Sequence, residues 1–436
     1  MNKNIPTKNA TMGATTHNHK EHTTATAPFH SAFFESLHKE QWQRVKLGEA
    51  PLQIIDGDRG KNYPKQNELF DNGYCLFLST KNVLNAKFDF TECQFINKEK
   101  DEILRKGKLQ IDDIVLTTRG TIGNIALYRE NIDYKNIRIN SGMVILRPDI
   151  MEVNSTFLLY AMLNSKKYID NFVSGSAQPQ LPIKDLSNLT IPLPPLETQH
   201  KIAEILSSLD DKIDLLHRQN KTLESLSLTL FRHTFIDNPK RNAWEEVTLN
   251  DICLKIASGG TPSTRIKEYY SGKINWYSTK ELDDNFLFDS IQTITEDGLE
   301  NSSAKLFPKD TIIIAIYAAP TVGRLGILTQ DSAFNQAACG LIIDETKCSK
   351  EFVFCFLKNE RENLNLLASG SAQQNLNVEK IKRYTLLLPD KATFHNFQIQ
   401  AKGFFDKIYN NSKQIQNLES LRDIMLPKLL SGEMEV

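Results

Sequence analysis

The stretch SGSAQPQLPIKDL at residues 174–186 is written again as SGSAQQNLNVEKI at residues 369–381. Both copies begin with the same five residues, 195 residues apart, and the apolar positions that follow keep their frame. The same offset relates DKI at 211–213 to DKI at 406–408, and QWQRVKLGE around Trp42 corresponds to AWEEVTLND around Trp244 with an offset of 202. A repeat this long indicates two tandem copies of a whole domain rather than a solenoid.

Composition limits the class of protein. The chain has 436 residues, 40% of them hydrophobic and 24% charged, which is typical of a soluble globular protein with two or three domains. Its longest apolar run, TIIIAIYAA from Thr311, is far shorter than the roughly 20 residues of a membrane span. Six scattered cysteines without a C-x-x-C pair predict neither a disulfide framework nor a metal site and fit a reducing cytoplasm. The net charge of −1 does not indicate a nucleic-acid partner.

Two segments carry apolar residues in alternating steps of four and three, which is the heptad pattern of a coiled coil. The first seam is Ile202, Leu206, Leu209, Ile213, Leu216, Asn220, Leu223, Ser227 and Leu230. The second seam is Phe397, Ala401, Phe404, Ile408, Asn411, Ile415, Leu418, Arg422 and Met425, and it ends at Pro427. In the first helix, which follows LPPLETQ, Thr198 is a candidate cap. The second helix follows LLLPDKATFHNFQ, which predicts a looser start. The alternative is that each helix packs only on its own domain.

The pattern predicts a mixed α/β (α+β) fold. Each copy begins with a strand around its tryptophan, continues with short β-rich runs separated by Gly and Asn, and ends in a long helix. An antiparallel pairing of the two helices would relate the copies by a pseudo-twofold axis. The expected divisions are a tail without a packed core at 1–38, globular domains at 39–195 and 237–391, and spacer helices at 196–236 and 392–436.

Several phrases in this order resemble the specificity subunit of type I restriction-modification systems. They are IIDGDRGKNYPK at Ile54, the repeated SGSAQ, IPLPPLETQHKIAEILSSLDDKID at Ile191 and IASGGTPSTRIKEYYSGKINW at Ile256, and the resemblance extends from Trp42 to Gly432. It implies two target-recognition domains, each of which reads one half of a bipartite double-stranded DNA site. It also implies that the helices set the gap and dock two methyltransferase subunits as well as restriction and translocase subunits. Catalysis is then absent from this chain, and S-adenosylmethionine, ATP and Mg²⁺ are expected in the partners.

Candidate DNA contacts follow from residue type, because Arg, Lys, Asn and Gln read base edges while Ser, Thr and Tyr mostly hold phosphates. In the first copy the candidates are Arg59, Lys61, Asn62, Tyr63, Lys81, Asn82, Arg119, Thr121, Asn124, Ser174, Ser176, Gln178 and Gln180. In the second copy they are Ser258, Thr261, Ser263, Thr264, Arg265, Lys280, Tyr317, Arg324, Ser371, Gln373 and Gln374. For each loop the alternative is an ordinary solvent-facing turn. The repeated SGSAQ has two readings as well: adenine recognition by its glutamines, or a turn of a shared scaffold. Unlike loops in the two copies predict an asymmetric target.

Other functions are also considered. Asp331 followed by Glu345, Thr346 and Lys347 imitates the acidic pair and lysine of metal-dependent nucleases, but such a trio arises easily by chance. The chain has no G-x-x-x-x-G-K-[ST] phosphate-binding loop. The same architecture would serve a methylation-only or type IIB-like assembly, or a duplicated coiled-coil adaptor that does not bind DNA.

Overall fold

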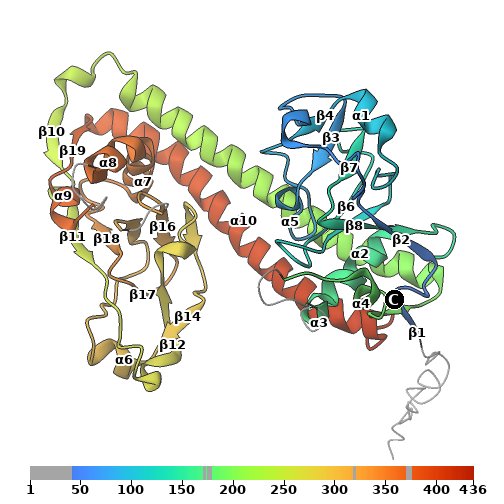
Figure 1. Ribbon diagram of the computed structural model, residues 1–436. Helices are drawn as coiled ribbons and strands as arrows, with labels where there is room; N and C mark the ends of the chain where they lie inside the picture. The colour runs from blue at the N-terminus through green and yellow to red at the C-terminus, as the bar shows by residue number, and fades with distance from the viewer. Residues whose placement is uncertain (1–41, 170–172, 174–178, 318–320, 370–375) are drawn as a thin grey trace, which may run out of the picture.

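The computed structural model describes residues 42–169, 173, 179–317, 321–369 and 376–436. Two globular domains are attached to a pair of long helices that run side by side in opposite directions (Figure 1). We call the globular part of the first copy domain 1 and that of the second copy domain 2. The expected mixed fold, with two tandem domains on an antiparallel helix pair, is confirmed. The expected N-terminal tail at 1–38 lies outside the described residues.

Domain 1 contains two sheets. The larger sheet is antiparallel, in the order β2-β8-β5-β6, and the smaller has the order β4-β3-β7 with β3 and β7 parallel. The strands are β2 (Leu52–Asp56), β3 (Cys75–Leu78), β4 (Phe95–Ile96), β5 (Ile114–Thr117), β6 (Ile125–Leu127), β7 (Ile137–Ile139) and β8 (Met143–Pro148). The helices are α1 (Lys98–Ile103), α2 (Ser155–Asn164), α3 (Lys166–Ile169) and α4 (Ile183–Leu186). Runs such as IVLT are fully buried, which explains their continuous apolar pattern.

Domain 2 repeats this topology with one additional strand. Its larger sheet has the order β11-β18-β15-β16-β13, and its smaller sheet has the order β14-β12-β17. The strands are β11 (Cys253–Ser258), β12 (Tyr270–Tyr277), β13 (Asn285–Leu287), β14 (Gln292–Ile294), β15 (Ile312–Ala315), β16 (Leu325–Leu328), β17 (Ala333–Phe334) and β18 (Ala338–Ile343). The helices are α6 (Glu296–Glu300), α7 (Lys350–Asn359), α8 (Arg361–Ser369) and α9 (Val378–Lys382). The duplication read from the sequence is therefore a duplication of fold.

A two-stranded ribbon closes each domain where it meets the helices. In domain 1, β1 (Gln43–Lys46) pairs with β9 (Thr190–Leu193), and in domain 2, β10 (Glu245–Thr248) pairs with β19 (Thr385–Leu388). Val45 lies opposite Ile191, and Val247 lies opposite Leu386. The first strands of the two ribbons are related by the offset of 202 and their last strands by the offset of 195, so the two ribbons pair in the same register. Because the ribbon joins the first and last strands of a domain, both of its ends are held at the helix pair.

The long helices are α5 (Leu196–Phe231), which continues into a π turn at Arg232–Ile236, and α10 (Lys391–Ser431). At about 1.5 Å per residue they are roughly 54 and 62 Å long. Short 3-10 turns occur at Gln66–Glu68, Thr80–Asn82, Arg241–Ala243, Lys267–Tyr269 and Thr279–Glu281. Within the ranges given above, no helix is both long and apolar enough to cross a membrane.

Two expectations about the helix ends were wrong. Thr198 does not cap α5, because the helix already begins at Leu196. The start of α10 is not loose: the Asp390 carboxylate accepts hydrogen bonds from Ala392 N and Thr393 N, and these bonds lower its pKa. Beyond Pro427, where the seam ends, α10 continues to Ser431, because burial of Leu429 and Leu430 against domain 1 stabilises the last turn.

The seam agrees with the heptad pattern at most positions and departs from it at one. Ile202, Leu206, Ile213, Leu216, Asn220, Asn411 and Ile415 are buried, whereas Leu209, Leu223, Leu230, Ile408, Leu418 and Met425 are half-buried. Phe404 is half-buried as well, and the side chain buried at that step is Phe405. The reason is that α10 turns this face toward domain 2, where Phe405 packs edge-on against Phe354. A heptad pattern describes contacts with the partner helix alone and therefore does not predict a residue that is buried against domain 2.

The two seam asparagines meet at the centre of the helix pair. By the sequence offset Asn220 corresponds to Ile415, so the asparagines stand at different heptad steps. Antiparallel pairing removes this mismatch: Asn411 Nδ2 donates to Asn220 Oδ1 at 2.9 Å, and Asn220 Nδ2 donates to Ser412 Oγ at 3.0 Å. A buried asparagine layer fixes register at some cost in stability. Ser412 continues the network by donating to Asn285 of domain 2.

This layer predicts the effect of a single substitution. Asn411→Leu is expected to lower the free energy of unfolding by about 1–3 kcal/mol, because Asn220 Oδ1 then stays buried without its donor. The double variant Asn220→Leu/Asn411→Leu is expected to lose less than Asn411→Leu alone, because it leaves no unpaired amide in the seam. Urea unfolding of the full chain measures both values. Losses that simply add would contradict a shared hydrogen-bonded layer.

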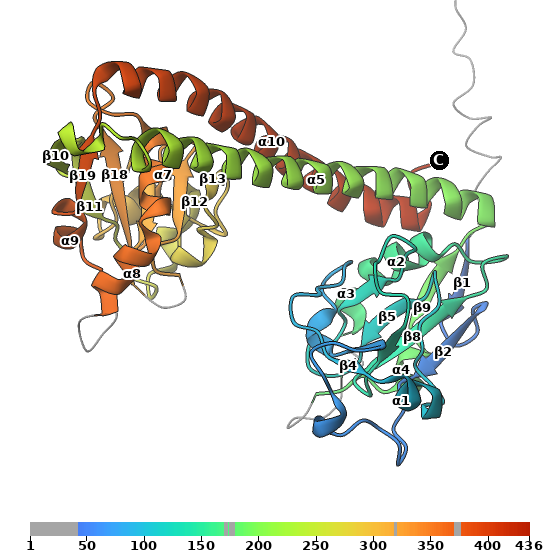
Figure 2. The ribbon, with the colours of Figure 1, turned by 90° about the horizontal axis from the view of Figure 1, so that it is seen from above.

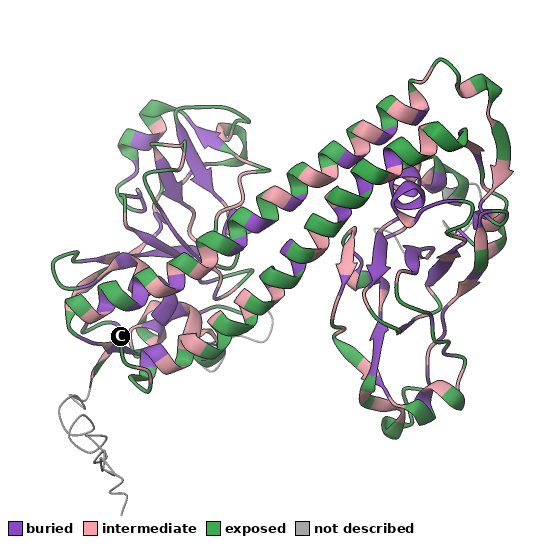
Figure 3. Cartoon of the chain, turned by 180° about the vertical axis from the view of Figure 1, so that it is seen from behind, coloured by how far each residue is buried: buried purple, intermediate pink, exposed green. Residues whose placement is uncertain are grey.

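The two domains are related by a pseudo-twofold axis. In Figure 1, half a turn in the plane of the page roughly exchanges the domains, and in Figure 2 both lie on one side of the helix pair. The buried side chains form separate interiors in the two domains and a stripe along the facing sides of the helices (Figure 3). The helix pair thus holds two similar domains apart and facing the same way.

Candidate nucleic-acid interface

In domain 1, loops that follow four strands converge at one edge. We call this group loop cluster 1; it consists of residues 57–60, 79–82, 118–121, 140–142 and 180. Asn140 N donates to Leu78 O at 3.2 Å, and Thr118 N donates to Gly142 O at 2.8 Å. Thr121 Oγ1 donates to Thr80 O at 3.2 Å. These hydrogen bonds join loops that lie as many as 140 − 78 = 62 residues apart in the sequence into one surface.

Loop cluster 1 exposes several of the expected DNA contacts. Arg59, Lys81, Arg119, Thr121 and Gln180 are all exposed, as is Lys61 just outside the cluster. Arg119 Nη2 donates to Gln180 Oε1 at 3.3 Å, so these two side chains lie together. Arg59 is held by Asp56 and by Ser141 O. The Gly60 and Arg105 N–H groups donate to the Asp58 carboxylate and lower its pKa, which keeps a buried charge at the base of the loop. The arrangement presents two guanidinium groups, an ammonium and an amide.

Three other candidates serve the scaffold instead. Asn82 is buried; its Nδ2 donates to Asp89 O and Glu92 O, and its Oδ1 accepts from Ser79 N, so no polar atom remains for a base. Asn124 Nδ2 donates to Val83 O. Tyr63 packs edge-on against Phe77 with ring centroids 5.7 Å apart. Asn62 beside it is half-buried. Residue type alone does not separate a loop-stabilising Asn from a base-reading one.

Domain 2 builds the same surface at equivalent positions. Loop cluster 2 consists of residues 258–265, 278–281, 316–317, 335–337 and 376. Asn335 N donates to Tyr277 O, Ile316 N donates to Ala337 O, and the Glu281 carboxylate takes the role of Asn82 at the 278–281 turn. Each cluster contains an asparagine whose side-chain oxygen accepts from the backbone N–H two residues later. These asparagines, Asn140 and Asn335, are related by the repeat offset of 195. Sequence reasoning missed these loop-shaping asparagines, although the repeat offset would have paired them.

The side chains on loop cluster 2 are partly different. Lys280 is exposed and corresponds to Lys81, because STK precedes both turns. Half-buried Tyr317 takes the place of Arg119, since Tyr317 N and Arg119 N both donate to the equivalent carbonyl of the neighbouring loop. Ser263, Thr264 and Arg265 are exposed. Arg324, by contrast, is half-buried at the position equivalent to Asn124, outside the cluster.

Two further side chains of loop cluster 2 had not been anticipated. Thr261 Oγ1 donates to Gln336 Oε1, and Lys305 Nζ donates to the carbonyl of half-buried Ser258 at 3.0 Å. Gln336 and Lys305 lie far along the chain from the SGGTPSTR loop, so only the fold brings them there.

The Gly259-Gly260 pair is required by packing. A Cβ at Gly259 would lie 2.1 Å from Phe334 O, and one at Gly260 would lie 1.9 Å from Ser303 O. The Gly260 carbonyl also accepts a 2.9 Å hydrogen bond from Nε1 of the buried Trp276. The glycines therefore allow the loop to lie against the domain rather than only forming a turn.

These contacts predict a matched pair of variants. Gly260→Ala is expected to lower the melting temperature of domain 2 and to displace the 258–265 loop, because two backbones would have to separate. Gly403→Ala in α10 is the control: a Cβ there meets nothing within 4 Å, so alanine is expected to stabilise the helix by about 0.5–1 kcal/mol. Thermal unfolding of both variants tests the assignment, and a neutral Gly260→Ala would contradict it.

The repeated SGSAQ itself falls outside the described residues, so Ser174, Ser176, Gln178, Ser371, Gln373 and Gln374 are not placed. The residues that follow it are placed. Leu181 N donates to Thr118 O at 2.9 Å, and Leu376 N donates to Ile316 O at 3.0 Å. Both copies of the phrase are thus followed by the same anchor on the same loop cluster.

Within the described ranges, no three His, Cys, Asp or Glu side chains gather as ligands for a metal ion. Of the nuclease-like trio, Asp331 accepts from Lys309 N, whereas Glu345, Thr346 and Lys347 follow Asp344, whose carboxylate accepts from Thr346. The Asp331 and Asp344 carboxylates thus accept hydrogen bonds from nearby loop residues. The exposed side chains of the two loop clusters are mainly polar and cationic.

Two similar loop clusters on a helix spacer define a duplicated recognition protein. The family model of the type I restriction modification DNA specificity domain matches the chain twice, at residues 39–225 and 242–420. The chain belongs to this family, which confirms the resemblance noted from the sequence.

The chain is 28% identical over 347 residues to the type I restriction enzyme MjaIX specificity subunit of Methanocaldococcus jannaschii, covering 74% of this chain and 78% of that protein. It is 24% identical to the HindI specificity subunit of Haemophilus influenzae, covering 86% and 98%. The crystal structure of a type I restriction-modification S subunit from M. genitalium has a similar fold, with a TM-score of 0.57 at 16% identity and coverage of 90% and 97%.

Proposed function

We propose that this chain recognises a bipartite, asymmetric double-stranded DNA site, with loop cluster 1 on one half-site and loop cluster 2 on the other. The observation that carries the proposal is that the two clusters have the same residue at one exposed position and different residues at another. Lys81 and Lys280 are the same residue at equivalent exposed positions, whereas Arg119 and Tyr317 differ. Phosphates are common to all DNA and bases are not. The two lysines therefore bind backbone phosphates, and the unlike residues read bases.

The helix pair supports the spacing. A helix of about 54 Å spans at most roughly 16 base pairs at 3.4 Å each, so two half-sites about one helical turn apart fall within its length. Both domains lie on the same side of the pair, as binding to one face of a duplex requires (Figure 2). The helices are the ruler that sets the gap.

Catalysis belongs to partner chains in this proposal. Two methyltransferase subunits bind one chain, one at each pseudo-equivalent end, and restriction and translocase subunits complete the assembly. S-adenosylmethionine, ATP and Mg²⁺ are bound by those subunits. The complex acts in the cytoplasm, where bacterial and archaeal DNA is located.

The salt dependence of DNA binding tests the proposal. For the full chain with its methyltransferase, the logarithm of affinity is expected to fall linearly and steeply with the logarithm of salt concentration. Lys81→Ala and Lys280→Ala are each expected to reduce the slope by about 1 and to weaken binding equally on every sequence. Lys309→Ala is the control: this exposed lysine precedes β15, at the end of the strand opposite to residues 316–317, and its loss is expected to leave the slope unchanged. An assembly without DNA affinity, or with a flat salt dependence, would identify a protein adaptor instead.

A further inference from the structure

The contact between domain 1 and the helix pair includes a polar network of three elements. Tyr160 on α2 is buried, and its hydroxyl donates to Asp210 Oδ2 on α5 at 2.6 Å. Arg422 on α10 donates to Asp210 Oδ1 at 2.8 Å. One carboxylate therefore ties domain 1 to both helices. We call these three residues joint 1.

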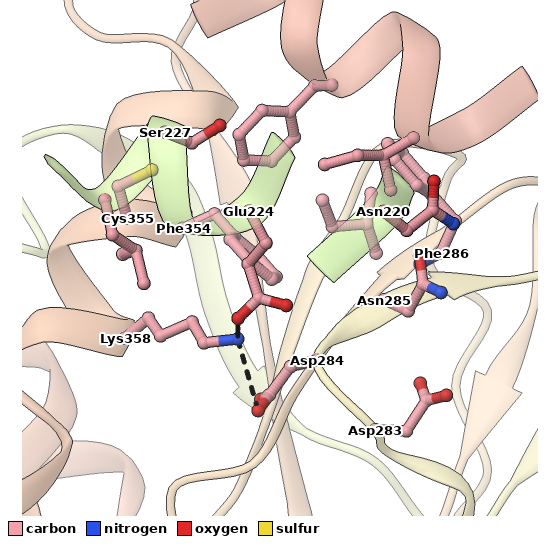
Figure 4. A pocket seen from close by; sticks show the side chains of 14 residues that line it. Asn220, Glu224, Ser227, Asp283, Asp284, Asn285, Phe286, Phe354, Cys355 and Lys358 are labelled. Carbon is pink, nitrogen blue, oxygen red and sulfur yellow. Dashed lines mark hydrogen bonds and ion pairs between the residues drawn. The ribbon is translucent and has the colours of Figure 1, made fainter. Parts of the chain in front are cut away.

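The pseudo-twofold places a different chemistry at the other end. An offset of 195 residues carries Tyr160 to Cys355, Asp210 to Phe405 and, in the reverse direction, Arg422 to Ser227. These three residues, which we call joint 2, are buried and line one pocket between domain 2 and the helices. Figure 4 shows Ser227 and Cys355 side by side there. The Ser227 hydroxyl donates to Leu223 O of its own helix, so no hydrogen bond links the three residues to one another. The three side chains of joint 1 are joined by hydrogen bonds, whereas those of joint 2 only pack around one pocket.

Domain 2 has its own polar tie one turn away. Lys358 on α7 forms ion pairs with Glu224 on α5 and with Asp284, 3.5 Å away (Figure 4). The equivalent residues at the domain 1 end are Leu163, Glu419 and Asn85. Leu163 carries no charge, so the ion pair between Lys358 and Glu224 has no counterpart at the domain 1 end, where Lys166 donates to Asn85 instead. Each end thus offers a charged contact where the other end has an apolar side chain.

We propose that the contacts in the two joints are specific, so that each end of the helix pair fits its own globular domain better than the other domain. The surface formed by Asp210 and Arg422 fits a domain whose docking helix carries a hydroxyl at the Tyr160 position. The surface formed by Ser227 and Phe405 fits a docking helix with a small apolar residue at the Cys355 position. A domain at the wrong end leaves the half-buried Asp210 carboxylate and Arg422 guanidinium without the hydroxyl. The proposal concerns assembly and does not depend on DNA binding.

Conversion of joint 1 into joint 2 tests this within the full chain. Tyr160→Cys alone and Asp210→Phe with Arg422→Ser are each expected to lower the melting temperature by about 5 °C or more, because each leaves mismatched partners. The triple variant is expected to recover at least half of the summed loss, since thiol, phenyl ring and hydroxyl then match as they do in joint 2. Losses that add, or a triple variant that is the least stable of all, would overturn the proposal.

A grafted chain supplies a second test, in which the same substitutions are expected to change the melting temperature in the opposite direction. Residues 42–195 are replaced by residues 244–390, so that the domain 2 sequence occupies both ends. In this background Asp210→Phe with Arg422→Ser is expected to raise the melting temperature, whereas in the native chain the same pair lowers it. An equal effect of the pair in the two backgrounds would show that the ends do not discriminate between domains.

Discussion

Replacement of Arg119 by alanine is expected to weaken binding of the cognate DNA by about 10- to 100-fold and to relax the preference at one base pair of one half-site. A guanidinium that reads guanine contributes about 1–3 kcal/mol of discrimination. Arg119 is exposed at the centre of loop cluster 1, and Gln180 holds its guanidinium in place. Binding to oligonucleotides that vary at every position of the site measures the effect.

The controls separate base reading from general attraction. Lys81→Ala on the same loop cluster is expected to weaken binding without a change in sequence preference, and Tyr317→Ala is expected to alter only the other half-site. Arg119→Lys retains the charge but loses the planar fork, so it is expected to behave like the alanine variant in preference. If Arg119→Ala weakened all sequences equally, Arg119 would be a phosphate contact and the assignment would be wrong.

Lengthening the helix pair by one heptad is expected to lengthen the gap of the target by about three base pairs. Seven residues added after Leu215 in α5 and seven after Gln416 in α10 extend both helices by about 10.5 Å where they face each other and retain the seam pattern. The half-site sequences are expected to stay the same. Because three base pairs also rotate the duplex by about a third of a turn, modification is expected to be slower.

Methylation mapping of the lengthened protein, co-expressed with its methyltransferase, measures the gap. Insertion into α5 alone is the control, because it displaces Asn220 from Asn411 and is expected to destabilise the chain rather than to shift the gap. An unchanged gap in the doubly lengthened protein would mean that the helices are not the ruler.

The duplication, the β-rich runs and the long helices follow from the sequence, because a repeat offset and a heptad are patterns within single segments. Register between the segments does not follow. Asn220 and Asn411 looked mismatched by offset, and only antiparallel pairing brings them together. Phe405 was missed because a heptad describes one partner helix, whereas α10 also packs on domain 2. The start of α10 was called loose although Asp390 was a readable cap.

The candidate site was predictable at the level of loops and less so at the level of residues. Arg119 and Gln180 were both chosen by type, yet their contact depends on a bridge across 61 residues. Asn82 had the right type but is buried, because its amide oxygen accepts from Ser79 N across the 79–82 turn and its amide nitrogen donates to Asp89 O and Glu92 O. Gln336 and Lys305 had no local signal, since they reach loop cluster 2 only through the sheet. Burial and hydrogen bonding, which decide availability, are properties of the fold.

The central claim is that two unlike domains on a fixed ruler read one bipartite site. The most direct test is to express the chain with its methyltransferase in a host and to map modified adenines across the genome by single-molecule sequencing. The account predicts methylation at one asymmetric motif with two short, different half-sites and a fixed gap. A stable complex that leaves the genome unmodified, or that methylates a motif without a gap, would contradict it.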